Sequence, residues 1–205
     1  MIRTISRIQF LFLMAFFLFG QNDIVSAQTG PLAEVPFRLV GGHVVIKVKV
    51  NDSPEMDFVF DTGAMGGIID QELESQLSLK NMSTQQVQGA GGQIINLKRS
   101  EKNKLKIGSL TFENSAFLLS DMSPFHARGL THSGILGLPQ LNQYVTEIDY
   151  EHNMLRFYKF DEYKYSGIGE RLPINLDIGI PSVEVEVENY DGQTVKGKVL
   201  VDTGA

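Results

Sequence analysis

Cysteine is absent from this sequence of 205 residues. Its absence excludes disulfides, a thiol nucleophile, a cysteine-based metal site and a lipid-modified cysteine. The formal net charge is -6 and there is no block of basic residues, so we expect neither nucleic acid nor an anionic membrane surface as a partner. A chain of this length can still build a sizeable core, and packing alone must hold its fold together.

The chain also lacks an apolar run long enough for a typical transmembrane helix. Its main apolar run covers residues 10–20, well short of the roughly 20 residues that span a bilayer. Two arginines precede this run, and "VSA" at residues 25–27 follows it, a pattern that suits signal peptidase. We therefore predict a signal peptide over residues 1–27, cleaved after Ala27, and a secreted or periplasmic protein without stable membrane insertion. An N-terminal membrane anchor is the alternative.

The tetrapeptide Asp-Thr-Gly-Ala occurs twice, at residues 61–64 and 202–205, each time directly after three apolar residues. The segments before the two copies also match, but their spacing is 137 residues instead of 141. The matching pairs are "VPFRL" (35–39) with "LPINL" (172–176), and "VVIKVKVND" (44–52) with "PSVEVEVEN" (181–189). A longer hairpin turn around Asp191 and Gly192 accounts for the difference. A repeat of this length indicates a duplicated domain.

The repeat predicts a first domain over residues 35–160, a linker over residues 161–171 and the start of a second, truncated copy over residues 172–205. In the first copy, apolar side chains at 44–50 alternate with lysines, as in a strand with one buried face. Strand, turn and strand are also expected at 86–97, 105–119 and 145–160, and short helices at 70–79 and 138–145. We predict an all-β fold, a closed antiparallel barrel with one or two short helices, plus the first hairpin of a second copy.

An aspartate between a buried strand and a Thr-Gly turn is open to two interpretations. A single Asp-Thr-Gly can be an ordinary turn in which the aspartate side chain bonds its own backbone. Two such aspartates in equivalent places of a duplicated domain can instead face each other across a pseudo-twofold axis. They would then share one proton, so that one accepts a proton from water while the other donates one to a carbonyl oxygen.

At these residues the sequence resembles a known family. "FVFDTGA" and "VLVDTGA" are similar to the active-site motif of aspartic peptidases of the pepsin and retroviral type. "SGILGLPQL" at 133–141 resembles the family's hydrophobic-hydrophobic-glycine element, and "QGAGGQ" at 88–93 resembles its flap hairpin. The whole arrangement resembles secreted bacterial proteins with two tandem retropepsin-like domains, so the resemblance implies a retropepsin-like (acid protease) barrel. Met65 departs from the family, whose members usually have a small or polar residue there.

The resemblance implies an aspartic endopeptidase that hydrolyses peptide bonds without a cofactor or metal ion. Its catalytic residues would be Asp61 and Asp202, with a peptide or protein as substrate. The residues that would support them are Thr62, Gly63, Thr203, Gly204, Ile135, Leu136 and Gly137. The flap, which would close over an extended peptide, would include Gly89, Gly91 and Gly92.

Two expectations concern activity. The second flap and the second hydrophobic-hydrophobic-glycine element are not in the sequence, so we expect a mobile Asp202 and no activity unless two chains form a homodimer that pairs Asp61 with Asp61. The alternative function is a catalytically silent β-domain that binds extended peptides. His126 and His132 lie six residues apart without a third ligand at a suitable spacing, so we interpret them as loop histidines.

Overall fold

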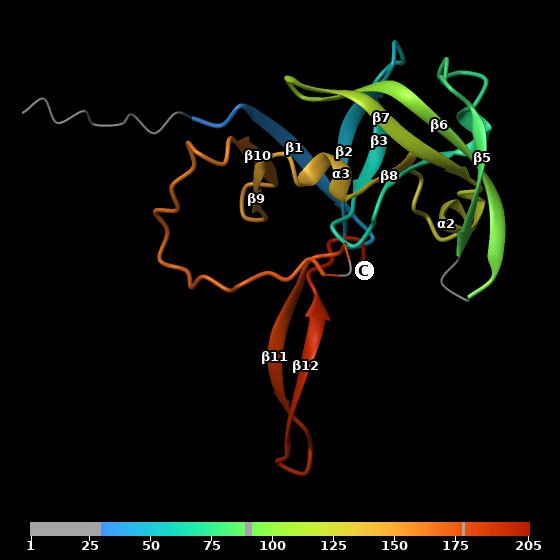
Figure 1. Ribbon diagram of the computed structural model, residues 1–205. Coiled ribbons are helices and arrows are strands. Elements are labelled where there is room, and N and C mark those ends of the chain that lie inside the picture. Colours follow the sequence, from blue (N-terminus) through green and yellow to red (C-terminus); the bar gives the residue numbers. More distant parts are fainter. Residues whose placement is uncertain (1–29, 89–91, 178) are drawn as a thin grey trace, which may run out of the picture.

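The computed structural model describes residues 30–88, 92–177 and 179–205, and these residues form an almost entirely β structure (Figure 1). The predicted signal peptide and the predicted flap residues Gly89 and Gly91 lie outside the described residues. Within the described part of the chain, none of the helices has the length and apolar character needed to cross a membrane.

Ten strands of the described residues form one sheet, in the order β5-β6-β7-β4-β8-β3-β2-β1-β10-β9. They are β1 (Ala33–Val40), β2 (His43–Val50), β3 (Met56–Phe60), β4 (Gly67–Asp70), β5 (Ser83–Gln88), β6 (Ile94–Ile107), β7 (Leu110–Ser120), β8 (Gly134–Leu136), β9 (Val145–Asp149) and β10 (Met154–Tyr158). An additional pairing of β6 with β2 links β6, β7, β4, β8, β3 and β2 in a ring. The sheet thereby wraps around one core.

The predicted all-β fold is confirmed, and two strand pairs of its largely antiparallel sheet are parallel. Strand β8 runs parallel to β3, and β4 runs parallel to β7. Strands joined by a hairpin must be antiparallel, but neither of these pairs is joined by one. Strand β8 inserts between β3 and β4 after a long excursion of the chain, and its direction is therefore free of that constraint.

The core follows the period-two pattern of the strands. Val44, Ile46, Val48 and Val50 of β2 are buried, while the lysines between them face water. Phenylalanines from β3, β7 and β10 fill the interior of the sheet. Burial of these apolar side chains supplies most of the stability that a fold without disulfides requires.

The helices are shorter than predicted. The segment 70–79 holds only the 3-10 helix η1 (Gln71–Leu73), whose N-cap is Asp70, as its carboxylate accepts the Glu72 N–H at 3.2 Å. Two four-residue helices follow, α2 (Ser123–His126) and α3 (Leu138–Leu141). Helix α3 stops early because residues from 145 onward enter β9 and pair with β10.

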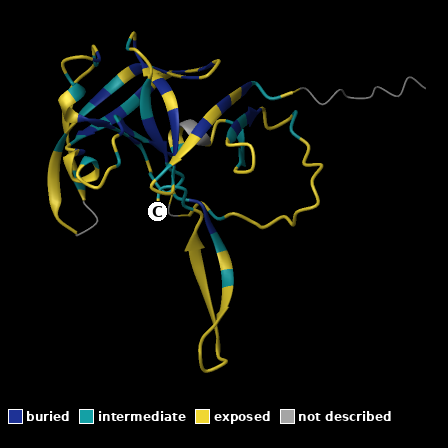
Figure 2. Ribbon diagram, turned by 180° about the vertical axis from the view of Figure 1, so that it is seen from behind, coloured by how far each residue is buried: buried dark blue, intermediate teal, exposed yellow. Residues whose placement is uncertain are grey.

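The described residues after β10 form an exposed linker and then a separate hairpin of β11 (Ser182–Glu188) and β12 (Thr194–Leu200) (Figures 1 and 2). Ser182 pairs with Leu200 just as Val45 pairs with Val59, with shifts of 137 and 141 residues. The isolated bridge between Asn175 and Ser182 likewise mirrors the pairing of Arg38 with Val45. The hairpin therefore has the same register as β2 and β3, with the extra residues in its turn.

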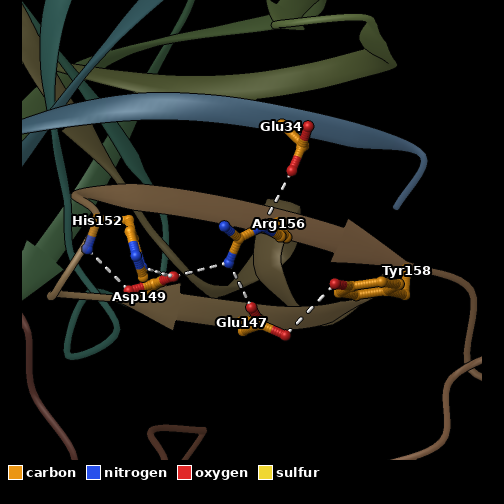
Figure 3. A network of polar contacts seen from close by, with 6 residues as sticks. All are labelled: Glu34, Glu147, Asp149, His152, Arg156 and Tyr158. Atoms are coloured by element: carbon orange, nitrogen blue, oxygen red, sulfur yellow. Dashed lines mark hydrogen bonds and ion pairs between the residues drawn. The ribbon is translucent and has the colours of Figure 1, made fainter. Parts of the chain in front are cut away.

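An ion-pair network connects strands β1, β10 and β9 at one edge of the sheet (Figure 3). Arg156 of β10 contacts Glu34 of β1 at 3.0 Å, and Glu147 and Asp149 of β9 at 2.6 and 2.9 Å. The His152 backbone N–H and the Arg156 guanidinium together hold the pKa of Asp149 well below its usual range. The network is solvated, so it contributes more to the geometry of this edge than to its stability.

From the family resemblance, the sequence predicts that Ile135 and Leu136 both lie in the core beneath Asp61. Leu136 is fully buried, with 0% of its surface exposed, whereas Ile135 is only partly buried. Neighbouring residues of a strand point to opposite faces, so only one of the two can face the core. The prediction is therefore wrong for Ile135.

We expect Leu136→Ala to lower the free energy of unfolding by about 2–5 kcal/mol, because it leaves a cavity in a closely packed core. Urea denaturation of the chain measures this change. Ile135→Ala is the matched control on the opposite face of β8, and it should cost clearly less. Equal losses for the two variants would contradict the position assigned to Leu136.

Candidate active site

The first Asp-Thr-Gly-Ala loop begins where β3 ends, and β8 holds it in place. The Asp61 N–H donates to the Leu136 carbonyl at 2.9 Å, and the Leu138 N–H donates to the Ala64 carbonyl at 2.9 Å. Gly137 lies between these two bonds, and a Cβ at this position would stand only 2.7 Å from the Gly66 carbonyl oxygen. Glycine is therefore needed here, because only a residue without a Cβ lets the two loops pack this closely.

The second Asp-Thr-Gly-Ala loop follows β12 and returns to the end of β3 (Figure 1). The Val201 N–H donates to the Pro181 carbonyl at 2.8 Å, which closes the base of the hairpin just before Asp202. Equivalent residues of the two loops, Thr62 and Thr203, then contact each other, although 141 positions separate them in the sequence.

Reciprocal hydrogen bonds between two threonines join the loops. The Thr62 N–H donates to Thr203 Oγ1 at 3.1 Å, and the Thr203 N–H donates to Thr62 Oγ1 at 3.0 Å. Each hydroxyl also donates to a carbonyl of the opposite loop: Thr62 to Val201 at 2.6 Å and Thr203 to Phe60 at 2.7 Å. Each donor on one loop has its counterpart on the other, which is the pattern of a local twofold axis.

The two carboxyl groups lie side by side above this junction. Within each loop, the glycine N–H donates to the aspartate, from Gly63 to Asp61 Oδ1 at 2.7 Å and from Gly204 to Asp202 Oδ1 at 2.8 Å. A Cβ on Gly63 would stand 2.5 Å from the Asp202 carboxyl, and one on Gly204 would stand 2.5 Å from Asp61 Oδ2. Each glycine thus leaves room for the carboxyl group of the other loop.

The electrostatic environment of Asp61 favours its protonated form. Burial raises the pKa of Asp61, the Gly63 N–H opposes this shift, and the neighbouring Asp202 carboxyl raises the pKa further by its charge and its hydrogen bond. Two carboxyl groups this close cannot both ionise readily, so the pair holds a proton to higher pH than an ordinary aspartate does. Such a pair can donate a proton and accept one at the same time.

The structure brings most of the predicted site residues together. Asp61, Thr62 and Gly63 meet their counterparts Asp202, Thr203 and Gly204, and Leu136 and Gly137 support the first loop. Strands β5 and β6 form the predicted flap hairpin, with Gln88 paired to Ile94, and Gly92 near its tip has a φ of +78°. Ile135 contributes its backbone to β8 but does not lie in the core.

The position of Asp202 differs from the expectation of a mobile terminal residue. The bonds that hold its loop come from Thr62 of the first Asp-Thr-Gly-Ala loop and from the Phe60 carbonyl at the end of β3. Sequence reasoning also missed the carbonyls of Phe60 and Val201 as acceptors for the threonine hydroxyls. No side-chain pattern marks a backbone acceptor, but both residues directly precede an aspartate of the repeat, and the repeat would have pointed to them.

Comparison with known proteins assigns part of the chain to a family. Residues 46–139 match the family described as "Aspartyl protease", and they include the first Asp-Thr-Gly-Ala and the Ile-Leu-Gly at residues 135–137. The matched segment is similar to the aspartyl protease family. It covers somewhat less than half of the chain and does not include Asp202.

The solved structures include a retropepsin-like aspartic protease from Rickettsia conorii that is similar to the chain. The sequence identity is 20% and the TM-score is 0.42, over 63% of this chain and 94% of the other. Comparison with curated protein sequences finds no match. The assignment to aspartyl proteases therefore rests on the matched segment.

Proposed function

We propose that the chain is an aspartic endopeptidase whose catalytic pair is Asp61 and Asp202 of the same molecule. The observation that carries the proposal is the reciprocal pair of threonine hydrogen bonds, which places the two aspartates in equivalent positions about one axis. A structural turn needs no such partner, so the symmetry favours an enzyme over the alternative, a silent β-domain that binds extended peptides.

The pair has the groups needed for general acid and base catalysis. In the proposed reaction, the ionised carboxyl accepts a proton from a water molecule as that water attacks the peptide carbonyl carbon. The protonated carboxyl donates its proton to the carbonyl oxygen, which gives a tetrahedral intermediate with two hydroxyl groups. As the C–N bond breaks, the first carboxyl gives its proton to the leaving nitrogen and the second takes a hydroxyl proton back, so an acid and an amine are released and the pair is restored. The N–H groups of Gly63 and Gly204 fix one oxygen of each carboxyl, so the other oxygens can face the substrate.

The substrate class that fits this site is an extended peptide. The flap hairpin of β5 and β6 projects as an exposed edge, and an edge strand can bind a peptide through main-chain hydrogen bonds. Gly92 has a left-handed backbone conformation that suits a turn at the flap tip. The reaction as proposed uses only carboxyl groups, backbone donors and water, so we propose no metal or organic cofactor.

Two further parts of the proposal come from the sequence. The common register of the β2–β3 and β11–β12 hairpins supports a tandem arrangement, in which residues 172–205 begin a second copy of the first domain.

The apolar run and "VSA" before Gln28 support export of the protein to the periplasm or the outside of the cell. A homodimer that pairs two copies of Asp61 competes with this account, because Asp202 would occupy the place of the second Asp61.

A statine-type peptide tests the proposed function, since its hydroxyl imitates the tetrahedral intermediate between two carboxyl groups. At a concentration about 100 times its Kd, such a ligand should stabilise the chain by about 2.7 kcal/mol, measured as a rise in the thermal unfolding midpoint. Asp202→Asn should lose most of this gain. A peptide that stabilises both forms equally would favour the silent β-domain, and a peptide that stabilises neither form would contradict the proposed site.

A further inference from the structure

A buried histidine lies close to the active-site support, although the proposed reaction does not use it. Only 6% of His132 is exposed, and its ring packs edge to face against Phe125 at 5.6 Å and His126 at 6.1 Å between centroids. Its Nε2 atom has no hydrogen-bond partner among the described residues. A buried polar atom without a partner is costly, and it would be costlier still with a positive charge.

The groups around His132 come from five elements. His126 of α2 approaches the His132 carbonyl with its Nε2 at 2.9 Å, and the same atom lies 3.8 Å from Asp70 Oδ2 at the end of β4. His43 of β2 lies near enough for its charge to act on the ring. Across a small cavity of about 80 Å³ lie Arg38 of β1 and Asp57 of β3.

Most of these neighbours oppose a charge on the ring. Burial lowers the pKa of His132, and charges on His126 and His43 lower it further. A hydrogen bond with the Leu130 backbone and the charge of Asp70 act in the opposite direction but do not cancel the effect. Arg38 and Lys47 are both paired with Asp57, at 2.9 and 3.0 Å, so Asp57 is already neutralised.

The backbone next to His132 leads directly to Asp61. The Ser133 N–H donates to the Asp57 carbonyl at 2.7 Å, and the Ser133 carbonyl accepts the Asp70 N–H at 2.9 Å. These two bonds fix the chain just before β8. The last residue of β8 is Leu136, whose carbonyl accepts the Asp61 N–H. Only the three residues of β8 separate Ser133, the neighbour of His132, from Gly137 at the catalytic loop, so a shift at His132 can displace that loop.

We propose that His132 is a pH-sensitive positioning residue, which holds the start of β8 in place while neutral and loosens it when protonated in mild acid. The effect on catalysis rests on the proposed function, but the effect on stability does not. Activity would then be limited on the alkaline side by loss of the proton shared by the aspartates, and on the acid side by protonation of His132.

The direction of the stability effect follows from linkage. The folded protein holds His132 with a pKa below its ordinary 6.5, so between the two pKa values the unfolded chain binds more protons. The stabilising contribution of His132 to the free energy of unfolding is therefore fully present above pH 6.5. It is lost as the pH falls toward the pKa that His132 has in the folded protein. Asp61 behaves in the opposite way, because its raised pKa makes the folded state bind more protons.

Urea unfolding of the full chain at about pH 7.5 and pH 5 tests the proposal. The background is Asp61→Asn, which removes the titration of Asp61, and His132→Phe keeps a ring in the same place. When the pH falls from 7.5 to 5, the equilibrium constant for unfolding should rise more in the chain with His132 than in His132→Phe. The difference can reach about 30-fold, which is the limit for a histidine that stays neutral in the folded protein. His132→Gln is a second variant, and it should flatten the pH dependence in the same way. Equal pH dependence in all three forms would overturn the proposal.

The second measurement is the pH profile of kcat in chains that retain Asp61. The ratio of kcat for His132→Phe to kcat for the parent chain should rise as the pH falls from 7 toward about 5. A constant ratio would contradict the positioning role. If the parent chain shows no hydrolysis at any pH while the unfolding data still differ, then the proposed function fails and His132 stands as a pH-sensitive support of β8.

Discussion

Asp202→Asn should lower kcat for peptide hydrolysis by at least about 10³-fold, because a positioned acid or base alone contributes about 10²–10⁴-fold. Asp61→Asn should have an effect of the same size. The two carboxyl groups share one proton and act as a unit, so the double variant should be little worse than either single variant. Steady-state kinetics with a peptide substrate measure all three.

This prediction separates a site within one chain from a site between two chains. If activity came from homodimers that pair Asp61 with Asp61, Asp202→Asn would remain active. If Asp61 of one chain worked with Asp202 of another, a mixture of the two single variants would recover part of the activity. The geometry predicts inactive single variants and an inactive mixture, since each molecule contains one complete pair.

Gly204→Ala should lower kcat by about 10²-fold or more. The new Cβ would stand 2.5 Å from Asp61 Oδ2, so either the second loop or the Asp61 carboxyl must shift. A displacement of about 1 Å at a catalytic group is enough for a loss of this size. The ten-stranded sheet should still fold, because Gly204 is not part of its hydrophobic core.

Gly197→Ala is the matched control for this substitution. It adds the same methyl group to β12, where no atom lies within 4 Å of the new Cβ. Its kcat should stay within about twofold of the parent value, since a substitution on an open surface rarely changes more than local stability. Similar losses for Gly197→Ala and Gly204→Ala would mean that the hairpin as a whole, rather than the approach of Gly204 to Asp61, sets the activity.

Much of this architecture could be predicted because its signals are local. The alternation of valine and lysine in 44–50 reports which face of β2 is buried, and Asp191 with Gly192 marks the turn of the second hairpin. The spacing of the repeats, 137 before the turn and 141 after it, is the same shift that the strand registers show. Sequence alone therefore aligned the two hairpins residue by residue.

The features that sequence missed depend on contacts over long distances. The parallel pairing of β8 with β3 follows from where the chain returns, and no local pattern encodes that path. The anchoring of Asp202 depends on Thr62 and on the Phe60 carbonyl, both in the other copy of the repeat. Reasoning from the neighbours of Asp202 in the chain therefore predicted mobility, although its neighbours in space hold it.

The buried state of His132 was missed for a related reason. Its loop, "SPFHARGLTHSG", is rich in turn-forming residues and looks exposed. The ring is nevertheless enclosed by Phe125 and His126 from the same loop, because α2 folds back onto the start of β8. The interpretation as loop histidines therefore gave the position of His132 in the chain but not its burial.

Specific activity across a dilution series shows whether one chain carries a complete catalytic pair. A site within the chain predicts a specific activity that stays constant as the protein is diluted, because each molecule works alone. A site formed between two chains predicts a rate that falls with the square of the protein concentration once dimers become scarce. Constant specific activity is the result that the paired Asp61 and Asp202 predict, and a quadratic fall would contradict it.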